Sequence, residues 1–133
     1  MSYSRYIRKF RILLDEAEKD FLNSCYNKTV SALWFAIENL LRAILIHAKG
    51  WVPERSGKLI SVFYNFLGMK IPEKTYLIKL INSLYMHRKN ADHRSNIYNA
   101  EKVREIYNKS KELIPELLNI AKLCNMDIED YLN

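Results

Sequence analysis

The chain has 133 residues, of which 49% are hydrophobic and 27% are charged, values typical of a folded soluble protein with one domain. Its formal net charge of +6 at pH 7 favours a polyanionic partner without identifying one. With only three glycines and three prolines, the sequence lacks the turn signals of β-hairpins, which argues against an all-β domain and favours long helices.

The first half of the sequence predicts two long helices. From Ser4 to Cys25, apolar residues recur at three- and four-residue steps, which is typical of an amphipathic helix. From Lys28 to Lys49 the sequence is apolar on nearly every side, which predicts a helix at the centre of a bundle or at a subunit interface. Because Glu38, Arg42 and His47 interrupt this apolar run, a membrane span is not expected.

Three further helices are predicted in the second half. The third covers Ser56 to Leu67, and the glycine that follows is its expected end. Pro72 opens the fourth, which reaches the polar segment Tyr85–Arg94. The fifth runs from Ala100 to Leu123, and Pro115 should kink or restart it.

These patterns predict an all-α fold, an antiparallel bundle of four to five helices in a single domain over residues 1–133. No secretory signal is apparent, so a cytoplasmic location is expected. Cys25 and Cys124 are expected to be buried thiols, with a bridge between the first and last helices as the alternative. Because Gly-rich phosphate loops and Cys-x-x-Cys pairs are absent, neither a cofactor nor a metal is expected.

The segment Tyr85–Arg94, YMHRKNADHR, is the strongest candidate for a site. Five steps along an ideal helix rotate by about 140°, so Arg88 and His93 would not share one face. Either the helix ends or distorts here, or the two groups face opposite walls of one cleft. Arg88 and Asp92 are spaced to form an ion pair, which would orient the arginine or be only a weak surface bridge.

An arginine and a histidine together suffice for RNA cleavage without a metal. A guanidinium stabilises charge growing on a phosphate, and an imidazole transfers a proton to or from a ribose oxygen. One imidazole does not easily serve both proton steps, whereas two copies at a two-fold axis would supply the pair. From spacing alone a solvated helix end is the more frequent explanation, because an arginine and a histidine at this spacing often occur by chance in a basic helical protein. His87, Asp92 and His93 lack the one-face spacing of a helical metal site.

Other residues are candidates for supporting roles. Glu38 and Arg42 predict an intrahelical pair at the edge of the core, or else Glu38 reaches the cleft and orients the motif arginine. Tyr85, His87 and Arg94 are candidate contacts to RNA, and simple packing or exposure is the alternative for each.

From roughly Asn27 to Leu118 the sequence resembles the HEPN superfamily (higher eukaryotes and prokaryotes nucleotide-binding). The segment SALWFAIENLLRAILIHAKGWVPERSGKLISVFYNFLGMKIP is similar to the helix–loop–helix core of that family. The segment RKNADHR is similar to its signature, an arginine followed a few residues later by a histidine.

This resemblance implies a helical bundle that dimerises so that two Arg–His motifs line a shared cleft. Many members are metal-independent ribonucleases that act as toxins, often encoded beside a minimal nucleotidyltransferase that serves as antitoxin. Carried over to this sequence, Arg88 is the phosphate-stabilising group and His93 the proton-transfer group.

The sequence departs from the family pattern at two places. Where a polar residue often follows the arginine, this chain has Lys89 and then Asn90, and either could fill the auxiliary role. Where some members have a modifiable tyrosine two residues past the histidine, this chain has Ser95, so that modification is not expected. The departure at Lys89 keeps open a non-catalytic module that binds a nucleotide or a partner, and a purely structural dimer remains a third alternative.

Overall fold

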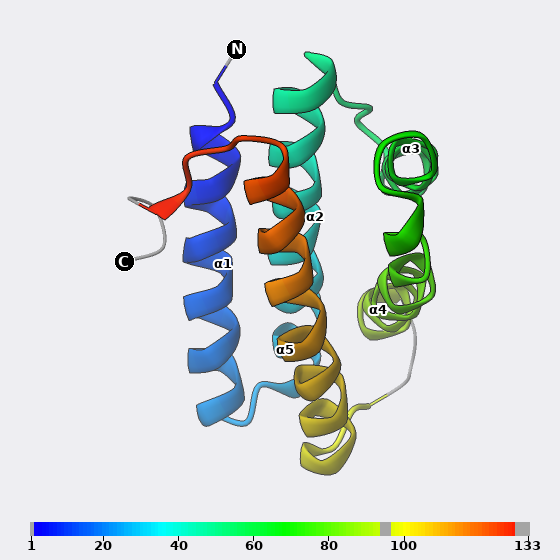
Figure 1. Ribbon diagram of the computed structural model, residues 1–133. Coiled ribbons are helices and arrows are strands. Elements are labelled where there is room, and N and C mark those ends of the chain that lie inside the picture. Colours follow the sequence, from blue (N-terminus) through cyan, green and yellow to red (C-terminus); the bar gives the residue numbers. More distant parts are fainter. Residues whose placement is uncertain (1, 94–96, 130–133) are drawn as a thin grey trace.

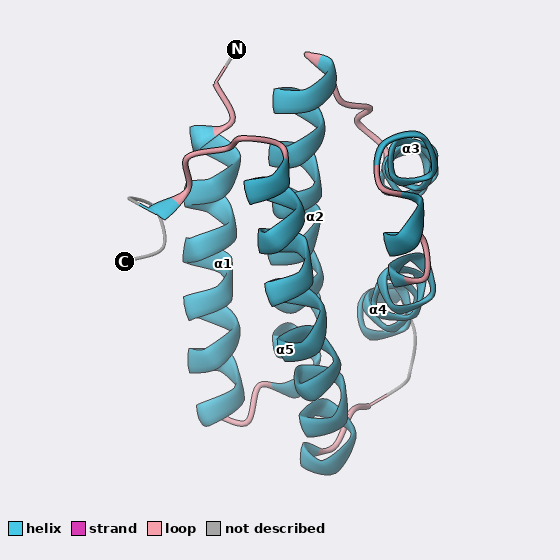
Figure 2. Ribbon diagram, viewed as in Figure 1, coloured by secondary structure: helices cyan, strands magenta, loops and turns pink. Residues whose placement is uncertain are grey.

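A computed structural model describes residues 2–93 and 97–129 (Figure 1). The elements in chain order are α1 (Ser4–Leu22), α2 (Tyr26–Lys49), α3 (Ser56–Lys70), a one-turn 3-10 helix η1 (Pro72–Lys74), α4 (Leu77–His93) and α5 (Ala100–Leu123). Figure 2 shows helices and loops and, over these residues, no strand. The prediction of an all-α helical bundle is confirmed.

Four predicted helix boundaries differ from the structure. α2 begins at Tyr26 rather than Lys28, and Pro72 opens the one-turn helix η1 rather than the fourth helix, since α4 begins only at Leu77.

α1 stops at Leu22 because Ser24 adopts a left-handed φ of 60°, which reverses the chain into α2. α3 continues through Gly68 to Lys70, so the predicted end at this glycine is wrong. The helix ends instead before Pro72, because a proline disfavours helical geometry in the residue that precedes it.

Of the two outcomes predicted for Pro115, a kink or a restart of the fifth helix, the structure excludes the restart. α5 is assigned as one continuous helix from Ala100 to Leu123 with Pro115 inside it. Leu113 and Leu117, on either side of the proline, are fully buried. Their packing offsets the backbone hydrogen bond that a proline cannot donate.

The prediction that Cys25 and Cys124 are buried thiols is wrong, because Cys25 is exposed and Cys124 is only partly buried. Both are free cysteines, so the alternative of a bridge between them is not formed either.

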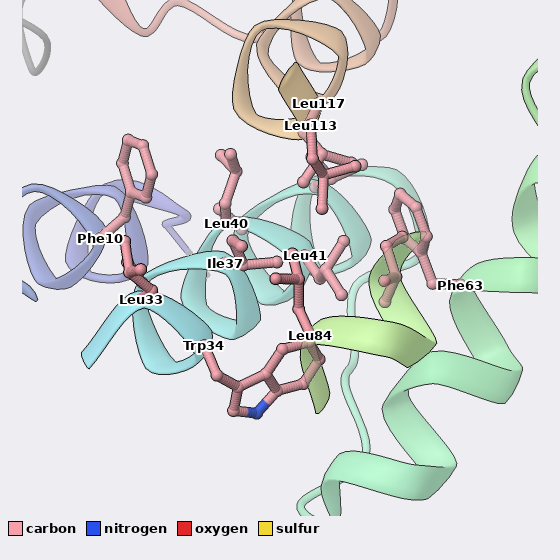
Figure 3. Packing of buried hydrophobic residues seen from close by; sticks show 14 of the residues in the cluster. Phe10, Leu33, Trp34, Ile37, Leu40, Leu41, Phe63, Leu84, Leu113 and Leu117 are labelled. Carbon is pink, nitrogen blue, oxygen red and sulfur yellow. The ribbon is translucent and has the colours of Figure 1, made fainter. Parts of the chain in front are cut away.

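α2 is the central helix of the bundle. In Figure 1, α1 and α5 lie alongside it, α1 running antiparallel to both, while α3 and α4 cover another side and cross these helices at a steep angle. Figure 3 shows how α2 fills the core. Its side chains Leu33, Ile37, Leu40 and Leu41 meet Phe10 of α1, Phe63 of α3, Leu84 of α4, and Leu113 and Leu117 of α5.

The composition of α2 also satisfies the length and hydropathy of a membrane span. However, 83% of its most apolar window is buried inside the fold, which is the behaviour of the core helix of a soluble protein. Each fully buried leucine or isoleucine of this helix contributes about 2 kcal/mol by leaving water. The prediction that this helix is central is therefore confirmed.

Candidate functional site

Arg88 lies in the last two turns of α4 and is held against α2. Its Nε atom is 2.9 Å from Oδ2 of Asp92, which confirms the predicted pair. The carbon at the centre of its guanidinium lies 4.9 Å from the centroid of the Phe35 ring. Stacking on an aromatic ring and pairing with a carboxylate both fix the plane of a guanidinium.

The way Arg88 is held leaves part of its hydrogen-bonding capacity unused. Nε is buried, and although Asp92 is close, its N–H does not align with an acceptor among the described residues. None of those residues accepts a hydrogen bond from the two terminal nitrogens either. The side chain keeps 22% of its accessible surface. Its outer edge is therefore available to a ligand.

Asp92 joins α4 to α2 as well as pairing with Arg88. Its Oδ1 accepts a short hydrogen bond from the hydroxyl of Ser31. Because the carboxylate and the guanidinium are both partly exposed, their ion pair contributes no more than about 1 kcal/mol to stability. The main effect of the pair is to fix the position of the Arg88 guanidinium.

Asn27, at the start of α2, fixes the end of the motif. Its Nδ2 donates to the carbonyl of Ala91 at 3.1 Å, and its Oδ1 accepts from the backbone N–H of Tyr98 at 3.1 Å. This one side chain therefore connects the last turn of α4 to the chain that leads into α5. Sequence analysis missed Asn27, Ser31, Phe35 and Tyr98. The available signal was a four-residue repeat of positions 27, 31 and 35, the first two polar, on the most apolar helix.

His87 and Asn90 are placed with Tyr98. The Tyr98 hydroxyl donates to the carbonyl of His87 at 3.2 Å and lies 3.3 Å from its Nδ1. Burial raises the pKa of Tyr98, an effect that a hydrogen bond with Asn90 opposes. Burial, assisted by nearby Lys102, lowers the pKa of His87, so this imidazole is neutral at pH 7. Within the part of the chain that the structure describes, no hydrogen bond or ion pair joins His87 or Asn90 to the Arg88–Asp92 pair.

Lys89 and Tyr85 form a second contact along α4. The Lys89 ammonium lies 5.5 Å from the centroid of the Tyr85 ring, and that ring is 5.2 Å from the ring of buried Trp34. Tyr85 is therefore an anchored aromatic with a cation beside it.

His93 is the final residue of α4. Its side chain and all of Arg94 lie outside the described residues. The helix is continuous from Arg88 to His93, so the two positions are separated by about 140° around its axis.

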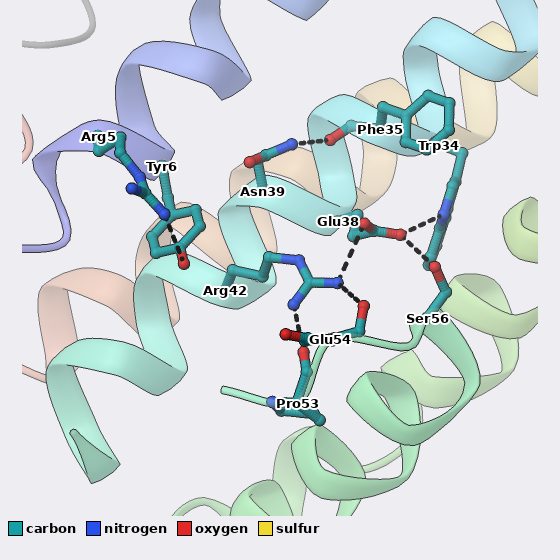
Figure 4. Close-up of polar contacts among 10 residues, drawn as sticks. All are labelled: Arg5, Tyr6, Trp34, Phe35, Glu38, Asn39, Arg42, Pro53, Glu54 and Ser56. Carbon is teal, nitrogen blue, oxygen red and sulfur yellow. Dashed lines mark hydrogen bonds and ion pairs between the residues drawn. The ribbon is translucent and has the colours of Figure 1, made fainter. Parts of the chain in front are cut away.

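Glu38 is placed in a different cluster, shown in Figure 4. Its carboxylate accepts from Trp34 Nε1 at 3.0 Å, from Arg42 at 3.2 Å and from the hydroxyl of Ser56. Arg42 also donates to the backbone carbonyls of the loop before α3. The predicted intrahelical pair is confirmed, and among the described contacts of Glu38 none reaches Arg88.

A groove of about 560 Å³ borders Asp92 on the side of α1. Glu16 and Asp20 of α1 line it together with Asp92, and among the described residues of its lining Lys28 is the basic one. The residues of this groove therefore give one side of the motif a negative field, which repels phosphate.

Comparison with known proteins identifies the family. No curated protein matches the sequence. The pattern of the HEPN domain matches residues 3–121, a range that contains α1 to α4 and all of α5 except its last two residues. The chain therefore belongs to the HEPN domain family.

Proposed function

We propose that this protein is a metal-independent endoribonuclease of the HEPN type that acts through Arg88 and His93. The observation that supports it best is the way Arg88 is held. Asp92 and Phe35 fix its Nε edge and its plane, while its two terminal nitrogens have no acceptor among the described residues. A guanidinium fork of this kind matches two oxygens of one phosphate.

The reaction follows from these two groups. The ribose 2′-oxygen attacks phosphorus as an imidazole takes its proton, and the bond from phosphorus to the 5′-oxygen breaks as that oxygen receives a proton. The products are a 2′,3′-cyclic phosphate and a 5′-hydroxyl. Arg88 stabilises the additional charge on the phosphorane. Lys89 and Asn90 are the auxiliary polar residues, and Asp92 positions Arg88.

The active form we propose is a cytoplasmic homodimer, because two proton transfers need two imidazoles and a two-fold axis supplies the second. The family resemblance further motivates a toxin paired with a minimal nucleotidyltransferase as antitoxin. Expression in a bacterial host should then arrest growth, and co-expression of a cognate nucleotidyltransferase should relieve the arrest. If expression of the His93→Ala variant arrested growth as strongly as expression of the wild type, the toxin proposal would be excluded.

The direct test is cleavage of single-stranded RNA in the presence of a metal chelator. Arg88→Ala and His93→Ala should each lower the rate by at least about 100-fold, the usual effect of losing a charge-stabilising or proton-transfer group. Arg104→Ala is the matched control, since Arg104 is an exposed arginine of α5 that stacks on Phe21. Equal rates in all four proteins would exclude this mechanism.

A second candidate, a non-catalytic module that binds a nucleotide or a partner protein, also has an observation in its favour. Asp92 balances the charge of Arg88, and the adjoining groove carries two more carboxylates. This alternative predicts binding of a nucleotide or of a nucleotidyltransferase partner that weakens in Arg88→Ala, with no cyclic phosphate formed by any variant.

A further inference from the structure

A separate cavity of about 400 Å³ lies between α3 and α4. Ser61 and Tyr64 of α3 and Asn82 and Tyr85 of α4 give it two aromatic rings, a hydroxyl and an amide. Gly57 and two isoleucines complete its lining. These residues recur at three- and four-residue steps on each helix, so two helical rows form its opposite walls. The cavity shares no lining residue with the acidic groove beside Asp92.

The two tyrosines of this cavity differ in freedom. Tyr85 is partly buried and packed against the ring of Trp34, which is itself 1% exposed. Tyr64 is 48% exposed, although it belongs to a helix whose other face is in the core. The cavity therefore has one fixed aromatic wall and one ring accessible from solvent.

The two helices that form the cavity carry a net positive charge. α3 and α4 together carry five lysines and arginines and a single carboxylate, that of Asp92, which is already paired. α1, by contrast, carries five basic and four acidic residues. The two helices that form the cavity therefore attract a polyanion, which the acidic groove on the other side of the motif repels.

The residues of α4 that line the cavity belong to a row that continues toward the motif. Positions 78, 82, 85 and 89 form one row on this helix, and Lys89 lies over the ring of Tyr85. From position 85 to position 93 the helix rises about 12 Å, a length that a short single-stranded segment spans.

We infer that this cavity binds one nucleobase of single-stranded RNA, in the nucleotides that flank the phosphate held at the motif. This inference rests on the proposed function, because it takes the motif as the phosphate site. The base stacks on Tyr64, and its edge pairs with the amide of Asn82, which has both donors and an acceptor. Lys89 neutralises the adjoining phosphate. The volume lies within the range of about 300–1,000 Å³ typical of small-ligand sites.

Two glycines of α3 provide a matched pair of variants for the test. A Cβ at Gly57 or at Gly68 meets no atom within 4 Å, so both positions accept a side chain. Gly57 lines the cavity and Gly68 does not. Gly57→Met fills the cavity, whereas Gly68→Met makes the same chemical change outside it. Both replace a helical glycine by a better helix former, so neither should unfold the protein.

The probe is a 2′-O-methyl RNA nonamer that contains 2-aminopurine, whose methylated ribose cannot be cleaved. Binding is measured by fluorescence anisotropy, and stacking by quenching of the 2-aminopurine. Gly57→Met and Tyr64→Ala should raise the Kd about 5- to 150-fold, the range for losing one stacked base, and should abolish the quenching. Gly68→Met should leave the Kd and the quenching unchanged. So should Tyr76→Ala, because Tyr76 is an exposed tyrosine outside the cavity.

The outcomes separate this inference from the proposed ribonuclease activity. If the wild type binds the probe in a way that depends on Gly57 and Tyr64 but cleaves no unmodified RNA, the base site stands and the ribonuclease proposal falls. If RNA is cleaved and all four variants bind the probe equally, the base site is excluded and the ribonuclease proposal stands. Absence of binding to the wild type, or tighter Gly57-dependent binding of an acidic peptide, also excludes the base site.

Discussion

Two arginine–carboxylate pairs of this protein have similar structures but different roles. Arg42 lies four residues from Glu38 in α2, and Arg88 lies four residues from Asp92 in α4, with closest distances of 3.2 and 2.9 Å. In each pair a serine hydroxyl from another helix donates to the carboxylate. By composition and spacing the two clusters are nearly the same.

They differ in how the guanidinium is used. Both terminal nitrogens of Arg42 donate within the protein, to Glu38 and to the carbonyls of Pro53 and Glu54. The guanidinium of Arg88 is held at Nε by Asp92 and on one face by the ring of Phe35, and its terminal nitrogens have no described acceptor. An arginine whose two terminal nitrogens both donate within the protein holds the fold together, whereas one whose terminal nitrogens remain available is suited to a ligand. This contrast, rather than the presence of an ion pair, separates a structural cluster from a candidate site.

The largest expected effect comes from breaking the structural cluster. Glu38→Ala should cost about 3–5 kcal/mol of unfolding free energy, because it leaves the largely buried Arg42 charge without its counter-ion and the Trp34 N–H without its acceptor. Asp92→Ala should cost only about 1 kcal/mol, because its pair is more exposed. Urea denaturation followed by circular dichroism measures both values. Equal costs for the two variants would show that the clusters do not differ in role.

The comparison also shows what the sequence could predict. The helices followed from apolar periodicity, and both ion pairs followed from four-residue spacing, since these are local properties of one helix. The groups that distinguish the pairs come from distant parts of the chain. Ser31 lies 61 positions from Asp92, and Asn27 lies 64 positions from Ala91.

The missed residues were therefore those whose role depends on tertiary packing. Phe35 was assigned only to an apolar helix, although its ring is what Arg88 stacks on. The predicted end of α3 at Gly68 failed for a related reason. A glycine permits a helix to end without requiring it, and Pro72 decided the boundary.

A smaller effect should follow from neutralising Asp92 while keeping its shape. Asp92→Asn retains a hydrogen-bond acceptor for Ser31 but removes the charge that balances Arg88. Affinity for an uncleavable RNA should rise about two- to fivefold, because the guanidinium no longer has a competing anion. The unfolding free energy should fall by less than about 1 kcal/mol. Fluorescence anisotropy at two salt concentrations measures the gain, which should shrink at high salt.

The matched control is Asp20→Asn, which removes a carboxylate from the groove wall formed by α1 without touching the pair. A gain as large in the control as in Asp92→Asn would mean that the field of the groove, rather than release of Arg88, limits the affinity.

The smallest effect concerns pH and tests whether the end of α4 is sensitive to acid. Burial, Lys102 and Lys109 lower the pKa of His87, an effect that Glu105 partly opposes. In the unfolded chain this imidazole binds a proton near its ordinary pKa of about 6.5. Its contribution to stability is therefore fully present above about pH 6.5 and is lost as the pH falls through the lower, folded pKa. His87→Gln should flatten the fall in urea midpoint between about pH 7.5 and about pH 5.

The matched control is His47→Gln, which removes another imidazole, one that contacts the carbonyl of Cys124. Because His87 is intact in this variant, its urea midpoint should fall with decreasing pH as steeply as that of the wild type. If the urea midpoint of His87→Gln fell with pH as steeply as that of the wild type, other groups would cause the acid sensitivity.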